Sequence, residues 1–135
     1  MHRCVENDNA KSTKEAEMAN KTTITTVDAF LKGQNNTANN TTACHADGKS
    51  YLFLFGNQIA CKENNRIKFR LCGWNTTTTR ARLKYLLNQF GLTVWTKQGD
   101  LFVASFPGFN GNIKHIKINA HDWYYIDDLK QQVEI

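Results

Sequence analysis

The chain has 135 residues, of which 41% are hydrophobic and 11% aromatic, and its net charge at pH 7 is +5. This length suits one domain with a single core, and no run of about eighteen apolar residues is present that would predict a membrane span. Asn and Thr are abundant, while Pro occurs once. We therefore expect one globular domain with thick polar loops.

Four cysteines are present, and none belongs to a Cys-x-x-Cys pair: Cys4, Cys44, Cys61 and Cys72. No apolar signal peptide precedes them, so reduced thiols and an intracellular location are expected. Zinc needs a tetrahedral set of ligands, which the adjacent Cys44 and His45 cannot easily share. The sequence therefore predicts no metal and no cofactor.

Residues 1–48 are predicted to be a polar leader and linker. Residues 1–20 are mixed in charge and lack periodicity, which is typical of a frayed or helical leader outside the main fold. Residues 26–33 could form one or two helical turns that begin at Thr26 or Asp28 and stop at Gly33. Residues 34–40 contain only Asn, Gln, Thr and Ala, which favours a linker.

Residues 49–135 are predicted to form the single compact domain, because apolar residues become dense there and turn signals recur every eight to twelve residues. Strands are expected within residues 51–55, 58–62, 66–71, 92–96, 101–106, 113–119 and 123–126. A short final helix is expected from Asp127.

One amphipathic helix is predicted between the third and fourth strands. Leu83, Leu86, Leu87 and Phe90 recur at i, i+3, i+4 and i+7, which places them on one helix face. A threonine of residues 76–79 is the expected N-cap, and a glycine follows the last apolar residue. The predicted fold class is α+β: a small antiparallel sheet of order βββ-α-ββ plus one or two strands, with this helix packed on one face.

The positive charge is concentrated between residues 62 and 84, which hold seven basic residues and one acid. Arg66, Lys68 and Arg70 alternate with apolar residues, so a strand would place three cations on one face. The solvated face of a half-buried sheet explains this pattern without a ligand. A bound polyanion also explains it, because it would neutralise like charges about 7 Å apart.

The helix start carries a second basic cluster. Arg80 and Arg82 fall in the first turn, where the helix dipole disfavours each cation by about 0.3 to 1 kcal/mol. Free N–H groups, threonine hydroxyls and arginines together suit a phosphate or carboxylate, although arginine also occurs at helix starts by chance. Trp74 and Trp95 could stack on bases, although such rings more often pack in the core. The predicted nucleic-acid or anion-binding residues are Arg66, Lys68, Arg70, Trp74, Thr77, Thr78, Thr79, Arg80, Arg82 and Lys84.

Catalytic signatures are absent from the sequence, which has no Gly-rich phosphate loop, no His-Glu-x-x-His and no nucleophile motif. His115, and His121 beside Asp122, are more readily explained as structural histidines than as general bases. Adjacent acids at Asp127 and the next residue more often cap a helix than bind a metal. We expect a protein that is not an enzyme.

Two segments resemble a family of small, uncharacterised domains from tailed bacteriophages. A strand ending in Gly56-Asn57-Gln58-Ile59-Ala60 is followed by a helix start that reads Gly-Trp-x-Thr-x-Thr-Thr-x-x-Arg-Leu from Gly73 to Leu83. The resemblance covers about residues 51–101, and the helix-start motif is its more specific part. It implies a phage origin and a location in the host cytoplasm, and it implies no activity or catalytic residue.

The leading hypothesis is a small, non-catalytic phage module that binds DNA or RNA, mostly through phosphates. One alternative is a phage accessory protein that binds an acidic surface of a host or defence protein and inhibits it. Another is a virion or assembly component. The sequence predicts no membrane association, and it leaves the oligomeric state open.

Overall fold

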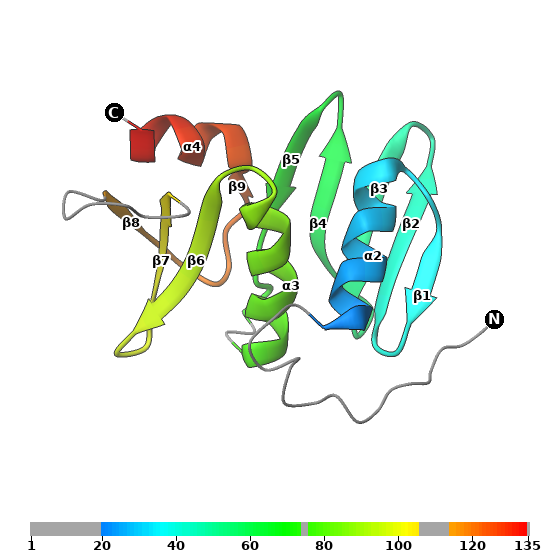
Figure 1. The fold of residues 1–135 in the computed structure, drawn as a ribbon, viewed down its shortest axis with the longest axis horizontal. Coiled ribbons are helices and arrows are strands. Elements are labelled where there is room, and N and C mark those ends of the chain that lie inside the picture. The colour runs from blue at the N-terminus through cyan, green and yellow to red at the C-terminus, as the bar shows by residue number, and fades with distance from the viewer. Residues whose placement is uncertain (1–19, 74–75, 106–113, 135) are drawn as a thin grey trace.

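The computed structural model describes residues 20–73, 76–105 and 114–134. In this part of the chain two antiparallel sheets combine with three helices, which confirms the predicted α+β class (Figure 1). The large sheet has the strand order β1 (Asn36–Ala38), β2 (Thr41–Ala46), β3 (Lys49–Leu54), β4 (Asn57–Glu63), β5 (Arg66–Phe69) and β9 (Tyr124–Tyr125). The small sheet has the order β6 (Leu92–Lys97), β7 (Asp100–Ser105) and β8 (His115–Ile118). The helices are α2 (Lys21–Lys32), α3 (Thr77–Asn88) and α4 (Ile126–Glu134).

Tight turns join strand β2 with β3, β4 with β5, and β6 with β7. In the turns Asp47-Gly48, Asn64-Asn65 and Gln98-Gly99 both central residues have positive φ, between 54° and 86°. Two such residues form the mirror-image turn whose twist matches that of paired strands, and Asn, Asp and Gly tolerate it best. These turns fix the register of the hairpins that they close.

Helices α2 and α3 pack together on one face of the large sheet, here called the inner face (Figure 1). Helix α2 begins after Asn20, whose Oδ1 accepts a hydrogen bond from Thr23 N at 2.8 Å, and ends at Gly33 with φ 71°. The predicted stop at Gly33 is confirmed, whereas the helix begins before the predicted Thr26. Helix α3 begins after Thr76, as predicted.

The prediction that residues 1–48 are a leader and linker is wrong for residues 21–48. Residues 21–48 form α2, β1 and β2, and they contribute Val27, Phe30 and Ala43 to the core. The domain therefore begins well before residue 49, while residues 1–19 lie outside the described part. Segments rich in Asn and Thr can form paired strands when one face of the sheet is covered, as α2 covers β1 and β2. Composition alone does not reveal that pairing.

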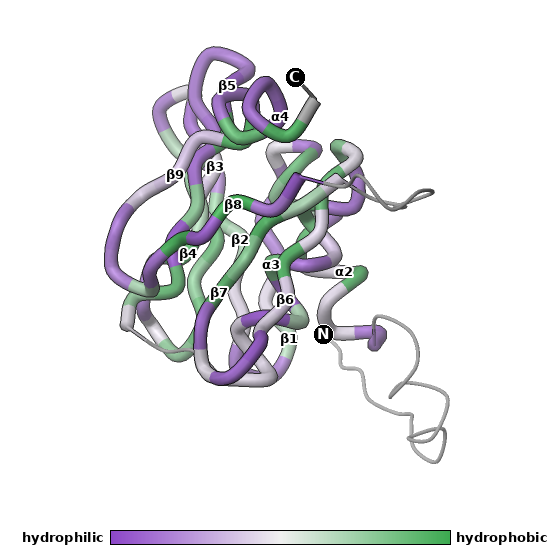
Figure 2. Tube along the Cα trace, turned by 90° about the vertical axis from the view of Figure 1, so that its left-hand side faces the viewer, coloured by the Kyte–Doolittle hydropathy of each residue, from purple (hydrophilic) through white to green (hydrophobic). Residues whose placement is uncertain are grey.

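One hydrophobic core joins both sheets and all three described helices. Its members include Phe30, Leu52, Phe69, Leu86, Val103 and Ile126. Figure 2 shows α2 and α3 on one side of β3 and β4, with hydrophilic residues at the tip of the β6–β7 hairpin. The prediction of one sheet under one helix is corrected, because β6, β7 and β8 pair only among themselves and α3 lies between the two sheets.

Candidate nucleic-acid interface

The outer face of the large sheet, opposite α2 and α3, carries both basic residues of β5, Arg66 and Lys68. Ile67 and Phe69 are buried against the core, so alternation places Lys68 on the outer face. The buried residues of the helices belong to the core, which leaves the outer face without a helical layer in the described part of the chain. A sheet with one open face is expected to carry polar residues there.

The outer face instead carries aromatic rings in register with the cations. Tyr51 of β3 pairs with Cys61 of β4, Cys61 pairs with Lys68 of β5, and Lys68 pairs with Tyr125 of β9. We call this line of four side chains the central row. Next to it, Phe53 pairs with Gln58, and the ring centroids of Tyr51 and Phe53 lie 6.2 Å apart.

Lys68 and Arg70 meet at the ring of Trp123, which precedes β9. The Lys68 Nζ atom lies 4.7 Å from the ring centroid, and the Arg70 Cζ atom lies 4.5 Å from it. Arg70 Nε also donates to the Gln58 carbonyl oxygen at 3.1 Å. Neither cation forms an ion pair with an acidic residue that the structure describes. Contact with a ring does not neutralise a cation, so two positive charges remain on this face.

Arg66 differs, because it is engaged by acids of α4. Its Nε and Nη2 atoms donate to the two carboxylate oxygens of Asp127 at 3.0 and 3.2 Å, and Nη2 also reaches Asp128. The hydrogen bond from Arg66 holds the pKa of Asp127 below its ordinary value. The prediction of three available cations along residues 66–71 is therefore corrected to two, Lys68 and Arg70.

Arg82 is buried, with 4% of its surface exposed, and cannot reach a phosphate. Its guanidinium donates to Thr41 Oγ1 at 2.9 Å, to Thr23 Oγ1 at 2.5 Å and to Asn40 Oδ1 at 3.1 Å. Burial lowers its pKa from the ordinary arginine value. The prediction that Arg82 binds an anion is wrong, because i, i+3 and i+4 spacing places it on the buried face with Thr79 and Leu86.

The α3 start is closed by its own side chains. Thr76 Oγ1 accepts a hydrogen bond from Thr79 N at 3.2 Å and lies 3.0 Å from Thr79 Oγ1. Thr79 is buried and Arg80 is half-buried, whereas Thr77 and Lys84 are exposed. Trp74 lies outside the described residues. Because α3 packs on the inner face, its start does not join the cations of β5 in one site.

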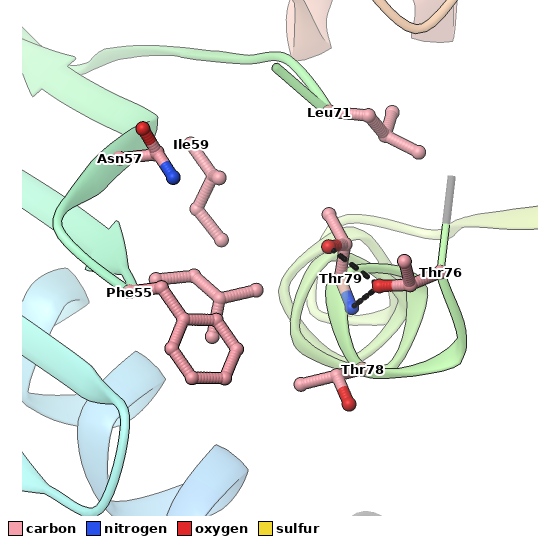
Figure 3. A pocket seen from close by; sticks show the side chains of 8 residues that line it. Phe55, Asn57, Ile59, Leu71, Thr76, Thr78 and Thr79 are labelled. Atoms are coloured by element: carbon pink, nitrogen blue, oxygen red, sulfur yellow. Dashed lines mark hydrogen bonds between the residues drawn. The ribbon is translucent and has the colours of Figure 1, made fainter. Parts of the chain in front are cut away.

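An apolar cleft of about 270 Å³ lies between the α3 start and the β3–β4 turn (Figure 3). Its lining residues are Leu54, Phe55, Asn57, Ile59, Leu71, Thr76, Thr78 and Thr79. Phe55 is 71% exposed and has φ 51°, a conformation that bulky residues rarely adopt. An exposed ring beside an apolar cleft is a surface on which another molecule could pack.

The outer-face rings could not be recognised from local sequence patterns. The run of apolar residues 51–55 concealed the alternation that puts Tyr51 and Phe53 on the outer face. Trp123 and Tyr125 reach β5 through a pairing some 55 residues apart, which no local pattern reveals. Trp95, which was considered for base stacking, instead stacks on Phe102 of the small sheet, with ring centroids 5.1 Å apart.

His115 and His121 contact residues close to them in the fold. The ring of His115 packs edge-on against Trp95, and His121 N donates to Asn119 Oδ1. Within the described ranges no three His, Cys, Asp or Glu residues lie close enough to hold a metal ion together. Nor does any described helix have the length and apolarity needed to span a membrane.

The fold and this surface define a small α+β protein with an open, basic and aromatic sheet face. The chain belongs to the Kyanoviridae Gp96 protein family, whose family model matches residues 19–129. This confirms the resemblance to a phage protein family and extends it beyond residues 51–101 in both directions. No curated protein and no solved structure matches the chain.

Proposed function

We propose that this phage protein is a non-catalytic module that binds nucleic acid in the host cytoplasm through the outer face of the large sheet. The observation that carries the proposal is the pair Lys68 and Arg70, two cations that lie beside the Trp123 ring and pair with none of the acids in the part of the chain that the structure describes. Phosphate groups are the natural counterions for such a pair, and an arginine can bind them with two parallel hydrogen bonds.

The number of phosphate contacts determines how steeply the affinity depends on salt concentration, and Lys68 and Arg70 would make two. The logarithm of affinity should fall with the logarithm of salt concentration with a slope of about −1.4 on single strands or −1.8 on duplex DNA. Affinity should therefore drop about tenfold between 50 and 200 mM salt. Six contacts, as the basic residues of the sequence suggested, would give a slope of about −4 to −5.

The test is fluorescence anisotropy with labelled DNA and RNA oligonucleotides. The double variant Lys68→Gln and Arg70→Gln should weaken binding and flatten the salt dependence. A matched control, Lys21→Gln with Lys97→Gln, removes two exposed charges elsewhere and should leave affinity nearly unchanged. Absence of binding by the unaltered protein at low salt would refute the proposal, as would equal effects of the two double variants.

A second candidate function is supported by the apolar cleft beside Phe55. A side chain that is 71% exposed in a strained backbone conformation fits a protein that binds a host or defence protein and inhibits it. Tagged protein should then retain one host protein in stoichiometric amount after nuclease treatment, and Phe55→Asn should abolish retention. Loss of all retained protein on nuclease treatment would rule this candidate out.

A further inference from the structure

We infer that the nucleic acid bound by this face is single-stranded, with bases stacked on Tyr51 and Phe53 and phosphates on Lys68 and Arg70. The inference rests on the proposed function and adds the class of nucleic acid. The inference applies to single-stranded DNA and single-stranded RNA alike, because both have unpaired bases on a negatively charged backbone.

The rings of Tyr51 and Phe53 lie on the outer face, away from the core. Both are half-buried, and neither is among the aromatic residues that pack against the core, whereas Tyr124 on the inner side is. Their planes are inclined by 31° to each other, so they form a nearly continuous apolar platform on β3. Stacking on such a platform stabilises unpaired bases regardless of sequence.

The sheet places the rings and the cations at a suitable separation. Tyr51 and Lys68 occupy equivalent positions on β3 and β5, with Cys61 of β4 between them, so their backbones are about 10 Å apart. Phe53 and Arg70 flank the same Gln58 in the neighbouring row. Each ring therefore has a cation across one intervening strand, and a base and a nearby phosphate of the same strand can be bound together.

The charged residues at the border of the platform form ion pairs with one another. Lys49 Nζ lies 3.7 Å from Glu63 Oε2, and Arg66 is bound by Asp127 and Asp128. Lys68 and Arg70 form no ion pair with an acid in the described ranges, and they lie next to the rings, which is where a polynucleotide would use their charge. A purely apolar protein partner would not need these two cations.

A duplex fits this surface less well than a single strand. Bases of a duplex are stacked on one another, and reading them requires an element that enters a groove. The outer face is a sheet surface on which Tyr51 and Phe53 are half-buried. Helices α2 and α3 pack on the other side of the sheet (Figures 1 and 2). Two cations alone give a duplex only a weak electrostatic attraction.

The experiment compares four probes of one base sequence, single-stranded and duplex, each as DNA and as RNA, at about 50 mM salt. Single strands should bind at least tenfold more tightly than either duplex. The double variant Tyr51→Leu and Phe53→Leu keeps apolar volume and removes the rings, so it should weaken single-strand binding by tenfold or more. The control Phe102→Leu removes a half-buried ring from the small sheet and should change affinity less than twofold.

The outcomes separate the two claims. One outcome is equal affinity for single strands and duplexes, weakened by substitution of Lys68 and Arg70 but not by substitution of Tyr51 and Phe53. This outcome would overturn the inference and leave the proposed function standing. Failure of all four probes to bind would overturn both. Circular dichroism of each variant shows whether it is folded. If the double leucine variant is unfolded, the single variant Tyr51→Leu replaces it. A loss of at least fivefold in its affinity for single strands supports the inference, and an unchanged affinity overturns it.

Discussion

Arg82 of α3 donates a hydrogen bond to Thr23 of α2, and this bond ties the two helices together on the inner face of the large sheet. Arg82 is the one charged residue that is buried in the described part of the chain. Its guanidinium donates to neutral oxygens of Thr23, Asn40 and Thr41. A buried guanidinium without a carboxylate depends on these hydrogen bonds for its stability.

Arg82→Ala should therefore destabilise the fold rather than a binding site. Removing the guanidinium leaves a cavity and buried hydroxyls without donors, and we expect the free energy of unfolding to fall by about 2 to 4 kcal/mol. Urea unfolding followed by circular dichroism measures this. Lys84→Ala, exposed on the same helix, is the control and should stay within about 0.5 kcal/mol of the unaltered protein. A stable Arg82→Ala protein would contradict the structural role.

Phe55→Asn should stabilise the protein. Phe55 and Gly56 both have positive φ in the β3–β4 turn, and Asn-Gly is the preferred pair for this turn. Relief of the strained conformation is expected to raise the free energy of unfolding by about 1 kcal/mol. Phe53→Asn, two residues earlier in the extended strand, is the matched comparison and should be destabilising. A lower melting temperature for Phe55→Asn would show that the ring packs more tightly than its exposure indicates.

The Arg66–Asp127 pair should stabilise the fold at neutral pH and lose this contribution in acid. The folded-state pKa of Asp127 is below its ordinary value, chiefly because of the hydrogen bond from Arg66. This contribution is present above the ordinary aspartate pKa of about 3.9 and disappears as pH falls through the lower folded value. Both groups face solvent, so the effect is expected to be small.

Thermal unfolding at pH 7 and at pH 2 checks that expectation. Asp127→Asn should lower the melting temperature at pH 7, and the gap to the unaltered protein should close in acid. Asp47→Asn alters a carboxylate in a turn that Asn tolerates equally well, so it should show no comparable change. A gap that persists at pH 2 would assign the effect of Asp127→Asn to packing.

Cys61 should alkylate more slowly than Cys44. Burial is the main cause that raises the pKa of the Cys61 thiol, and the thiolate is the reactive form. Cys44 is half-buried on β2, on the other side of Tyr51 in the same register. Reaction with iodoacetamide at pH 8, followed by peptide mass spectrometry, compares the two directly. Equal rates would mean that the outer face opens easily at the central row.

Local patterns were sufficient for much of this fold. The meander of β3, β4 and β5, the helix α3 and the hairpin of β6 and β7 follow from apolar periodicity and turn residues, and each is confirmed. Strands β1 and β2 were missed because their Asn and Thr residues resemble a loop in composition. Only the neighbouring helix α2 shows why they pair.

The candidate site was only partly accessible to sequence reasoning. Alternation correctly placed Lys68 on one face of β5, opposite Ile67 and Phe69. Charge alone could not separate Arg82, which is buried with neutral partners, from Arg70, which lies on a ring. The rings that complete the surface come from β3 and from the segment before β9, and long-range pairing brings them together.

The short ladder of strand β9 should make hydrogen exchange near the C-terminal end of the chain sensitive to a ligand on the outer face. Strand β9 joins β5 through two residue pairs, Lys68 with Tyr125 and Phe69 with Tyr124, and it is the place where the chain after β5 returns to the large sheet. Such a short ladder should open more often than the longer hairpins, so its amide protons should exchange early with solvent. A polynucleotide bound at Lys68 and the rings beside it would favour the closed ladder. The ligand would thereby slow hydrogen exchange at the C-terminal end of the chain as well as at the surface that it touches.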